Sequence, residues 1–221
     1  MSRPAITLVL ATQNPGKLAE LRALVHGLPV AVAGIKDIVP DYQAPAATGA
    51  TFEENAIIKA RAVAQATPLG ALADESGLAV DALGGRPGGG PAGFARGGAA
   101  VAENNAALLM ALDEVDDAAR TARFRCVVAL CDPFAAEANR VELFSGACEG
   151  SVARSARGES GFGYDPLFVL QGRTQTFAEL AGEEKASVSH RGMAMRKLVP
   201  RLASLIEARI AESSVILERA R

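Results

Sequence analysis

The spacing of apolar and polar residues changes along this chain, and each change predicts the boundary of a strand, a helix or a loop. Ala5–Ala11 is a continuous apolar run, which predicts a buried strand. Thr12–Pro15 has the composition of a turn, and Gly16–Val25 then carries leucines at helical spacing. Leu28–Ile35 predicts a second strand. The chain therefore opens with a strand, a tight loop, a helix and another strand.

A capping signal marks the start of a second helix. Thr51-Phe52-Glu53-Glu54 has the form of a capping box, with Thr51 as the N-cap and Glu54 at the third helical position. The helix should run to about Gln65. It follows Val39–Ala50, whose many Pro, Ala and Gly residues predict a loop.

The rest of the pattern mixes strands and helices. We expect short strands at Leu72–Asp74 and Leu78–Val80, on either side of Glu75-Ser76-Gly77, and an antiparallel pair of strands at Ala122–Asp132 and Arg140–Val152. Loops are expected at Gly84–Gly98 and Gly158–Asp165. The expected helical segments are Ala100–Leu112, a helical turn at Thr176–Leu180, and a last helix at His190–Ala211 that Pro200 kinks or interrupts. The residues after this helix should fray. A parallel-type unit followed by a hairpin predicts an α/β fold with a mixed sheet.

Composition narrows the class of protein. The chain has 221 residues, of which 49% are hydrophobic and 22% are charged, and this balance excludes a disordered, collagen-like or coiled-coil protein. The net charge is -2, so the basic excess of a broad nucleic-acid or anionic-membrane surface is missing. No apolar run approaches the length of a membrane span. We therefore expect neither nucleic acid nor a membrane as a partner.

Cysteine and histidine usage excludes two further classes. Cys126, Cys131 and Cys148 are odd in number and contain no C-x-x-C spacing, which argues against a disulfide framework or a zinc site. The chain has two histidines, His26 and His190. A cytoplasmic protein with reduced thiols is the simplest interpretation. A nucleophilic pair of Cys148 and His190 has little support, because no third orienting group is identifiable.

The first candidate site is Thr12-Gln13-Asn14-Pro15-Gly16-Lys17, which follows a strand and opens a helix. Helix N-termini offer free N–H groups and partial positive charge, which suit a phosphate. Lys17 adds a cation in the first turn, where it opposes the helix dipole unless an anion binds. The alternative is a surface lysine after a turn, and the segment is not a P-loop.

Two further candidates lie on the next elements. Asn55 and Lys59 share one helical face, although Lys59 could equally be a solvated charge. Asp74-Glu75-Ser76-Gly77 places two carboxylates side by side, and a hard cation such as Mg²⁺ would relieve their repulsion and help orient a water. The alternative is a turn in which Gly77 takes a positive φ.

The last two candidates lie in the C-terminal half. Ser160–Pro166 sets Phe162 and Tyr164 between glycines, which allows an aromatic ring to stack on a base, or else to form a small hydrophobic cluster. Glu183–Gly192 contains Lys185, and its Ser189 can cap the final helix with His190 and Arg191 in the first turn. Cations there make sense if they face an anion or carbonyl acceptors.

Taken together and in order, these motifs resemble those of the inosine triphosphate pyrophosphatases. The resemblance spans about Ile6 to Leu198. It implies an elongated mixed sheet flanked by helices in two lobes with a central cleft, as one domain over residues 1–211 followed by a tail at 212–221, and a homodimer. It also implies Mg²⁺-dependent hydrolysis of the nucleoside triphosphates ITP, dITP and XTP to the monophosphate and pyrophosphate.

The resemblance assigns a role to each candidate residue. Lys59, Asp74 and Glu75 would be catalytic, with Asp74 and Glu75 also holding the metal and Glu75 in the position of the general base. Substrate would be bound by Thr12, Gln13, Asn14, Pro15, Gly16, Lys17, Ser76, Phe162, Gly163, Tyr164, Asp165, Lys185, His190 and Arg191.

The chain departs from the family pattern at three places. Glu75 replaces an aspartate, Ala46-Ala47 replace acidic residues before Thr48-Gly49, and Pro91–Phe94 replaces a segment with an arginine that Arg86 or Arg96 could substitute. One hypothesis is that the longer Glu75 compensates for the lost upstream carboxylate. The alternatives are a Maf-like pyrophosphatase with a shifted base preference and a weakly active nucleotide-binding paralogue.

Overall fold

A computed structural model of the chain describes residues 6–12, 14–89, 94–95, 99–135 and 140–219. These residues divide into two compact units. Unit 1 consists of Met1–Asp74, Val128–Phe144 and Met195–Arg221, and unit 2 consists of Glu75–Val127 and Ser145–Ala194. Asp74 and Glu75, which are neighbours in sequence, fall on either side of this division.

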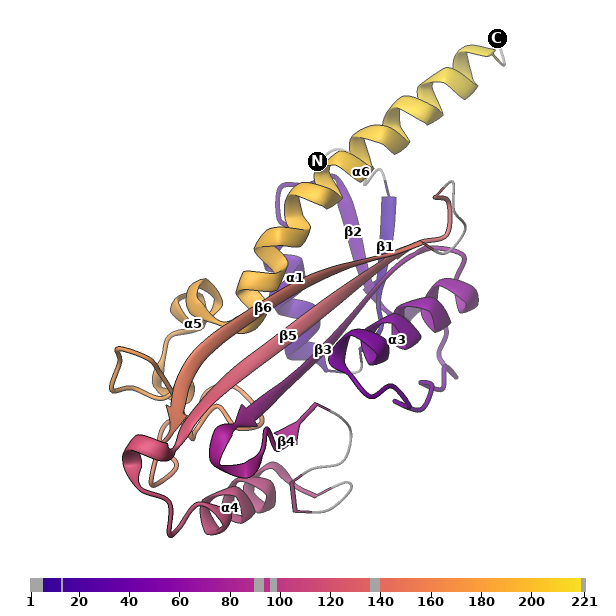
Figure 1. The fold of residues 1–221 in the computed structure, drawn as a ribbon. Coiled ribbons are helices and arrows are strands. Elements are labelled where there is room, and N and C mark those ends of the chain that lie inside the picture. The colour runs from indigo at the N-terminus through magenta and orange to yellow at the C-terminus, as the bar shows by residue number, and fades with distance from the viewer. Residues whose placement is uncertain (1–5, 13, 90–93, 96–98, 136–139, 220–221) are drawn as a thin grey trace. The chain divides into compact units, whose positions relative to one another are not determined.

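Strands and helices alternate along most of the chain (Figure 1). The strands are β1 (Ile6–Leu10), β2 (Val30–Gly34), β3 (Gly70–Val80), β4 (Pro87–Gly88), β5 (Thr121–Asp132), β6 (Arg140–Val152) and β7 (Phe168–Leu170). The α-helices are α1 (Pro15–Leu24), α2 (Ile35–Ile38), α3 (Phe52–Ala66), α4 (Val101–Ala111), α5 (Gly182–Val188) and α6 (His190–Arg219). Short 3-10 helices occupy Asp81–Leu83, Asp117–Ala119 and Phe177–Glu179. The predicted α/β class is confirmed.

The described strands form one mixed sheet with the order β2-β1-β3-β5-β6-β7, and β4 pairs with β3. β1 runs parallel to both β2 and β3, whereas β4 is antiparallel to β3 and β7 is antiparallel to β6. β5 and β6 are neighbours, and the connection between them is shorter than the dozen or so residues of a parallel crossover. They are therefore the antiparallel pair that the sequence predicted.

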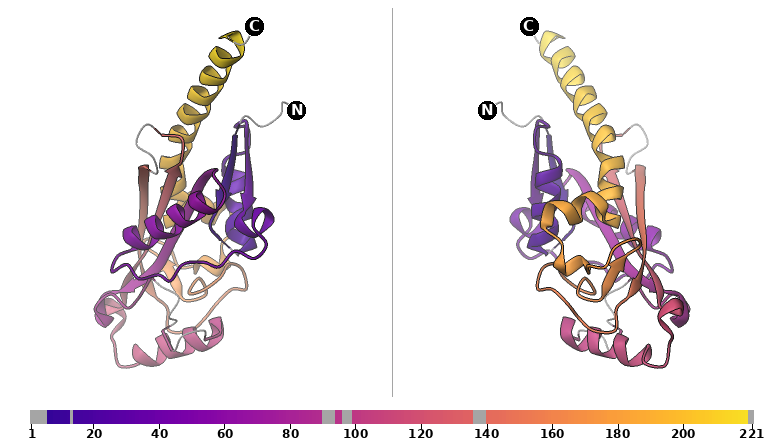
Figure 2. Two further views of the ribbon diagram at one scale, coloured as in Figure 1. Left: turned by 90° about the vertical axis from the view of Figure 1, so that its right-hand side faces the viewer. Right: turned by 90° about the vertical axis from the view of Figure 1, so that its left-hand side faces the viewer.

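In unit 1 the predicted opening elements are present. The apolar run becomes β1, and its Leu8, Val9 and Leu10 are fully buried. α1 contacts β2, and α3 contacts β1. Figure 2 draws these indigo to purple elements from two opposite sides. The second strand ends at Gly34, because Ile35 begins the short helix α2, which the sequence did not predict.

The capping box at the start of α3 is confirmed. The Thr51 side chain accepts a hydrogen bond from the Glu54 N–H at 3.1 Å, and the Glu54 carboxylate accepts from Thr51 N–H and Ala50 N–H. Asn55 is buried and binds both backbone polar groups of Gly49, at 2.8 and 3.2 Å. A Cβ at Gly49 would lie 2.6 Å from the Glu54 Cβ. The end of the preceding loop is therefore fixed to the first turn of α3.

The prediction of two separate short strands at Leu72–Asp74 and Leu78–Val80 is wrong, and so is the alternative of a turn at Gly77 with a positive φ. β3 runs without a break from Gly70 to Val80, and Gly77 is not among the glycines with positive φ. Gly77 has a different reason to lack a side chain: a Cβ there would lie 2.1 Å from the carbonyl oxygen of Gly88 in β4. The glycine marks a close approach of two strands, which a sequence pattern cannot distinguish from a turn.

The core of unit 2 is aromatic. Phe124, Phe168 and Phe177 form a cluster with ring centroids 4.8 to 5.8 Å apart. The His190 ring stacks on Phe124 at 4.6 Å. Edge-to-face and offset contacts of this kind add about 0.5–1.5 kcal/mol per pair beyond the burial of apolar area. The cluster therefore provides a rigid base for the start of α6.

The final helix is longer than predicted. α6 continues through Pro200 and past Ala211 to Arg219. Residues after Ala211 include no Gly or Pro that would end a helix. Ser189 caps α6 as expected, because its hydroxyl accepts from the Gly192 N–H at 3.1 Å. The sequence also missed β4, β7 and α5, all of which are short.

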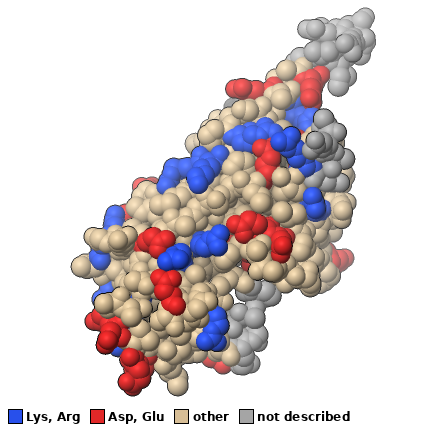
Figure 3. Space-filling model, in the orientation of Figure 1, with Lys and Arg blue, Asp and Glu red and all other residues tan. Residues whose placement is uncertain are grey.

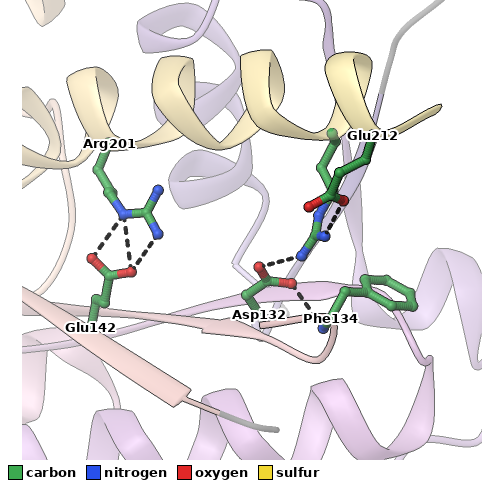
Figure 4. A network of polar contacts seen from close by, with 6 residues as sticks. Asp132, Phe134, Glu142, Arg201 and Glu212 are labelled. Carbon is green, nitrogen blue, oxygen red and sulfur yellow. Dashed lines mark hydrogen bonds and ion pairs between the residues drawn. The ribbon is translucent and has the colours of Figure 1, made fainter. Parts of the chain in front are cut away.

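Within unit 1, ion pairs fasten α6 to the end of the β5–β6 pair (Figure 4). Arg201 binds Glu142 through two nitrogens at 2.7 to 3.0 Å. Arg209 binds Asp132 and Glu212, each at 2.7 Å. The hydrogen bonds from Arg201 lower the pKa of the Glu142 carboxyl, with burial acting in the opposite direction.

Replacement of Glu142 by glutamine is expected to lower the melting temperature at pH 7 by a few degrees, because a partly exposed bidentate pair contributes about 1 kcal/mol. A carboxyl whose pKa is lowered on folding stabilises the protein above its unfolded pKa and loses this effect as the pH falls through the folded pKa. The difference between E142Q and wild type should therefore shrink as the pH falls below the ordinary glutamate pKa of about 4.3. Calorimetry at pH 3 and pH 7 measures it, and E212Q, at an exposed site on the same network, is the control.

The face drawn in Figure 3 carries basic and acidic side chains next to one another. Among the described residues, no helix is both long and apolar enough to cross a membrane.

Candidate functional site

The segment between β1 and α1 is organised by Asn14. Its side-chain oxygen accepts from the N–H groups of Gly16 and Lys17, at 2.9 and 3.4 Å, and Pro15 occupies the first helical position. The Asn14 N–H donates to Thr12 Oγ1 at 3.1 Å. Two of the N–H groups expected to face a phosphate are thus bound by the Asn14 side chain in this structure. Gln13 lies outside the described residues.

Lys17 has a protein anion as its partner. Its Nζ lies 2.7 Å from Asp74 Oδ2, and the Asp74 side chain is 2% exposed. The sequence argument requires an anion near a cation in the first turn of α1, and β3 supplies one. The Lys17 side chain remains one-fifth exposed in this pair.

A pocket of about 180 Å³ lies beside this ion pair in unit 1. With about 30 Å³ for each water molecule in the liquid, it has room for roughly six waters, and hence for a phosphate group. Its walls are formed by Ala11, Thr12, Lys17, Ile35, Tyr42, Ala44, Pro45, Lys59 and Asp74. Lys59 reaches it from the face of α3 that the sequence indicated. Two lysines and one carboxylate thus meet at a hollow that suits a hydrated anion.

Glu75 and Ser76 continue β3 into unit 2. Glu75 is buried, with 5% of its surface exposed, and successive side chains of a strand point to opposite faces of the sheet. Arg191 donates a hydrogen bond from Nη2 to Ser76 Oγ at 3.4 Å. The structure thus brings the motifs Asp74–Gly77 and Glu183–Gly192 together at Ser76.

Asp165 holds the glycine loop together. Its Oδ2 accepts from the Phe162 N–H at 2.7 Å and from Lys185 Nζ at 2.6 Å. Gly161 has a φ of +83°, and a Cβ there would lie 2.2 Å from Asp165 Oδ2. Burial raises the pKa of the Asp165 carboxyl, while Lys185 acts to lower it.

Two cationic side chains, Lys185 and Arg191, lie over the Phe162 ring. Lys185 Nζ lies 4.9 Å and Arg191 Cζ 5.1 Å from its centroid. Cation–π contacts of this kind contribute about 0.5–2 kcal/mol. Gly163 is fixed by its carbonyl, which accepts from Asn105 Nδ2 of α4 at 3.2 Å, and Tyr164 packs against the core of unit 2. The motifs Ser160–Pro166 and Glu183–Gly192 therefore form one cluster.

Unit 2 thus holds the cluster of Ser76, Phe162, Gly163, Tyr164, Asp165, Lys185, His190 and Arg191, together with Glu75, whereas Thr12, Asn14, Pro15, Gly16, Lys17, Lys59 and Asp74 belong to unit 1. Of the two arginines considered as substitutes in the glycine-rich segment, Arg86 lies over the Phe94 ring at 5.7 Å. Arg96 and residues 91–93 lie outside the described residues.

The structure bears on two other possible sites, a nucleophilic Cys148 and a metal site built from protein side chains alone. Burial raises the pKa of the Cys148 thiol to about 11, which disfavours the thiolate that a nucleophile requires. In the described part of the chain, no group of three or more His, Cys, Asp or Glu side chains lies close enough together to hold a metal ion.

Two residues beside these clusters were missed by the sequence analysis. Tyr42 lies in the Pro- and Ala-rich loop but forms part of the pocket wall next to Lys17. Asn105 lies on α4 and holds the glycine loop. Neither belongs to a motif, and both depend on tertiary contacts between distant segments. An alignment of relatives could have identified them, but a single sequence could not.

Comparison with known proteins identifies the family. A dITP/XTP pyrophosphatase of Geobacter sulfurreducens is 47% identical over 191 residues, which cover 86% of this chain and 94% of that protein. The structure of a HAM1 protein from Coxiella burnetii superposes with a TM-score of 0.81 at 40% identity, over 90% of this chain and 99% of that one. A Mycobacterium abscessus structure described as a nucleoside-triphosphatase / dITP/XTP pyrophosphatase has a TM-score of 0.69 at 43% identity, over 88% and 100%. The model of the Ham1 family matches residues 8–201, so this chain belongs to the Ham1 family.

Proposed function

We propose that this protein hydrolyses non-standard purine nucleoside triphosphates, ITP, dITP and XTP, to the monophosphate and pyrophosphate. It is a nucleoside triphosphate pyrophosphatase, as its relatives are by name. The structural observation that supports this most is the pocket where Lys17 and Lys59 meet beside Asp74. A hollow lined by two lysines suits a polyphosphate far better than a neutral substrate.

The phosphate tail is bound by unit 1 in this proposal. Lys17 and Lys59 neutralise phosphate charge, which is the main requirement for attack of water on a polyanion. Thr12 lines the pocket. Asn14, Pro15 and Gly16 shape the loop, and rotation of the Asn14 side chain frees two N–H groups of α1 for phosphate oxygens. Gln13 completes this segment.

The nucleoside is bound by the cluster around Phe162. Hypoxanthine and xanthine carry a 6-oxo acceptor where adenine carries a 6-amino donor. Arg191, Lys185 and the backbone N–H groups of Gly163 and Tyr164 are donors for such an acceptor, and Asp165 keeps Lys185 in place. A site that donates at this position leaves adenine with unmet donors and can discriminate by about 10⁴-fold. Ser76 on β3 and His190 on α6 support the cluster.

Mg²⁺ is the metal that fits these residues. Mg²⁺ is usually held by one or two carboxylates together with substrate phosphates and water, so it needs no cage of three protein ligands. Because successive side chains of β3 point to opposite faces, one carboxylate, that of Asp74 or Glu75, would hold it together with phosphate oxygens and water, and it would supply charge neutralisation at the phosphates. Glu75 accepts a proton from the attacking water as the water oxygen bonds to the α-phosphorus. The bond from that phosphorus to the oxygen bridging to the β-phosphate breaks, and pyrophosphate leaves.

Three further proposals concern the whole molecule. The two compact units act as the lobes of one catalytic domain over residues 1–211, and residues 212–221 are an accessory tail. The protein is a homodimer, which sedimentation equilibrium tests directly. It works in the cytoplasm, where Cys126, Cys131 and Cys148 stay reduced.

Pyrophosphate release from ITP, XTP, GTP and ATP, measured side by side with and without Mg²⁺, tests the proposed function. We expect ITP and XTP to be hydrolysed at least a hundredfold more efficiently than ATP, and only with the metal. Preference for a modified pyrimidine triphosphate would instead indicate a shifted base preference. Tight nucleotide binding without metal-stimulated turnover would indicate a binding protein.

A further inference from the structure

The hydroxyl of Tyr42 is buried without an evident purpose in the free protein. Its Oη is closed off from solvent and has no hydrogen-bond partner among the described residues. A buried polar group left unsatisfied costs about 1–3 kcal/mol, so native structures seldom keep one without a reason. Phenylalanine would fill the same space without this cost.

The surroundings of Tyr42 indicate what the hydroxyl can bind. The residue forms part of the pocket wall together with Lys17, Lys59 and Asp74. Its backbone N–H donates to the Val39 carbonyl at 3.0 Å, which anchors the residue at the start of its loop. Residues 39–50 contain neither helix nor strand, so no ladder of backbone hydrogen bonds holds this part of the wall. Tyr42 therefore lines the pocket, and its hydroxyl is buried within the pocket wall.

The chemistry of the group favours donation. Burial raises the pKa of the Tyr42 phenol, so the group keeps its proton at neutral pH. A protonated phenol offers one donor, and phosphate oxygens are strong acceptors. The lysines of the pocket supply charge, but Lys17 is shared with Asp74. A neutral donor adds a directional contact without adding to the charge.

We propose that Tyr42 is a further substrate-binding residue, whose hydroxyl donates a hydrogen bond to a phosphate oxygen of the triphosphate in this pocket. This inference rests on the proposed function. It gives a role to the loop in which Ala46 and Ala47 replace the acidic residues of the family pattern. The loop then contributes a neutral donor to the pocket.

The substitution Tyr42→Phe tests this proposal because binding and stability should move in different directions. The melting temperature of the free protein should stay the same or rise, since an unsatisfied hydroxyl is removed. The Kd for inorganic pyrophosphate with Mg²⁺, measured by calorimetry, should rise roughly tenfold, the effect of one hydrogen bond to a charged group. The KM for ITP should rise by a similar factor, with kcat changed less.

Thr67→Val is the matched control in the same unit. The Thr67 hydroxyl is buried and donates to the Val63 carbonyl at 2.8 Å, so its loss should lower the melting temperature and leave pyrophosphate affinity unchanged. If Tyr42→Phe behaves like this control, the hydroxyl is structural and the proposal is wrong.

Assays of the wild-type protein distinguish failure of the Tyr42 role from failure of the proposed function. If it hydrolyses ITP while Tyr42→Phe keeps wild-type affinity for pyrophosphate, the inference about Tyr42 fails and the proposed function stands. If the wild type releases no pyrophosphate from any nucleotide in the panel, the proposed function is wrong, and the role of Tyr42 in binding a triphosphate is wrong as well.

Discussion

Replacement of Glu75 by glutamine is expected to lower kcat for pyrophosphate release from ITP by about a thousandfold. Glutamine has nearly the same shape but cannot take a proton from water, and loss of a general base typically costs 10²–10⁴-fold. Glu75 is buried in β3, so the substitution should leave the backbone in place. Steady-state kinetics with saturating Mg²⁺ measure the effect.

The control for this experiment is Glu114→Gln, which changes an exposed glutamate after α4 and should keep wild-type kinetics. A kcat for Glu75→Gln within tenfold of wild type would contradict the role of Glu75 as the base.

Glu75→Asp addresses the compensation hypothesis separately, because it restores the family pattern while Ala46 and Ala47 remain. If the longer side chain compensates for the missing carboxylates, the aspartate variant should need more Mg²⁺ for half-maximal activity. Equal or greater activity at low Mg²⁺ would show that it does not.

The second large effect is expected from the pair of Asp165 and Lys185. Asp165→Ala should lower the free energy of unfolding by about 3–5 kcal/mol, because it leaves the largely buried Lys185 ammonium without its partner. It also removes the acceptor of the Phe162 N–H. For a chain of this length the melting temperature should fall by about 10 °C, measured by calorimetry.

Two variants locate the cause of this loss. Asp165→Leu combined with Lys185→Met removes both charges and should recover much of the stability, since a buried ion pair contributes little net energy. Asp117→Ala, at an exposed ion pair with Arg154, should change stability by less than about 1 kcal/mol. A comparable loss in Asp117→Ala would mean that burial is not what makes the Asp165 pair important.

The pH dependence of the same group has a defined sign. A carboxyl whose pKa is raised on folding contributes most stability below its unfolded pKa and loses this contribution as the pH rises through the folded pKa. Burial is the main reason for the raised pKa of Asp165. The advantage of wild type over Asp165→Asn, which does not titrate, should therefore shrink as the pH rises above the ordinary aspartate pKa of about 4.

Local signals in the sequence were sufficient for the elements that they encode. The capping box at Thr51 and Glu54 positioned α3 correctly, and Ser189 marked the start of α6. Both are contacts within one turn, so the spacing of the residues contains all the information. For Lys17 the sequence indicated a bound phosphate as the anion, whereas in the structure the carboxylate of Asp74 lies beside it.

Contacts between distant segments could not be predicted in this way. A turn at Gly77 was one of the two interpretations of Asp74–Gly77, because nothing in the sequence shows that the backbone of Gly88 passes 2.1 Å from the position of a Cβ on Gly77. Tyr42 gave no signal at all, since an unsatisfied hydroxyl exists only in three dimensions. Ala211 lies in the middle of good helix formers, so the end predicted there had no capping signal to support it.

The burial of all three cysteines has a practical consequence for spectroscopy. Each thiol is buried, and the pKa of the Cys131 thiol, like that of Cys148, is raised by desolvation. Maleimide dyes react with exposed thiolates, so the native protein should stay unlabelled under mild conditions. A single cysteine introduced on an exposed helix surface would then accept a fluorophore selectively. Distance measurements between a label in each compact unit become feasible without first removing the natural thiols.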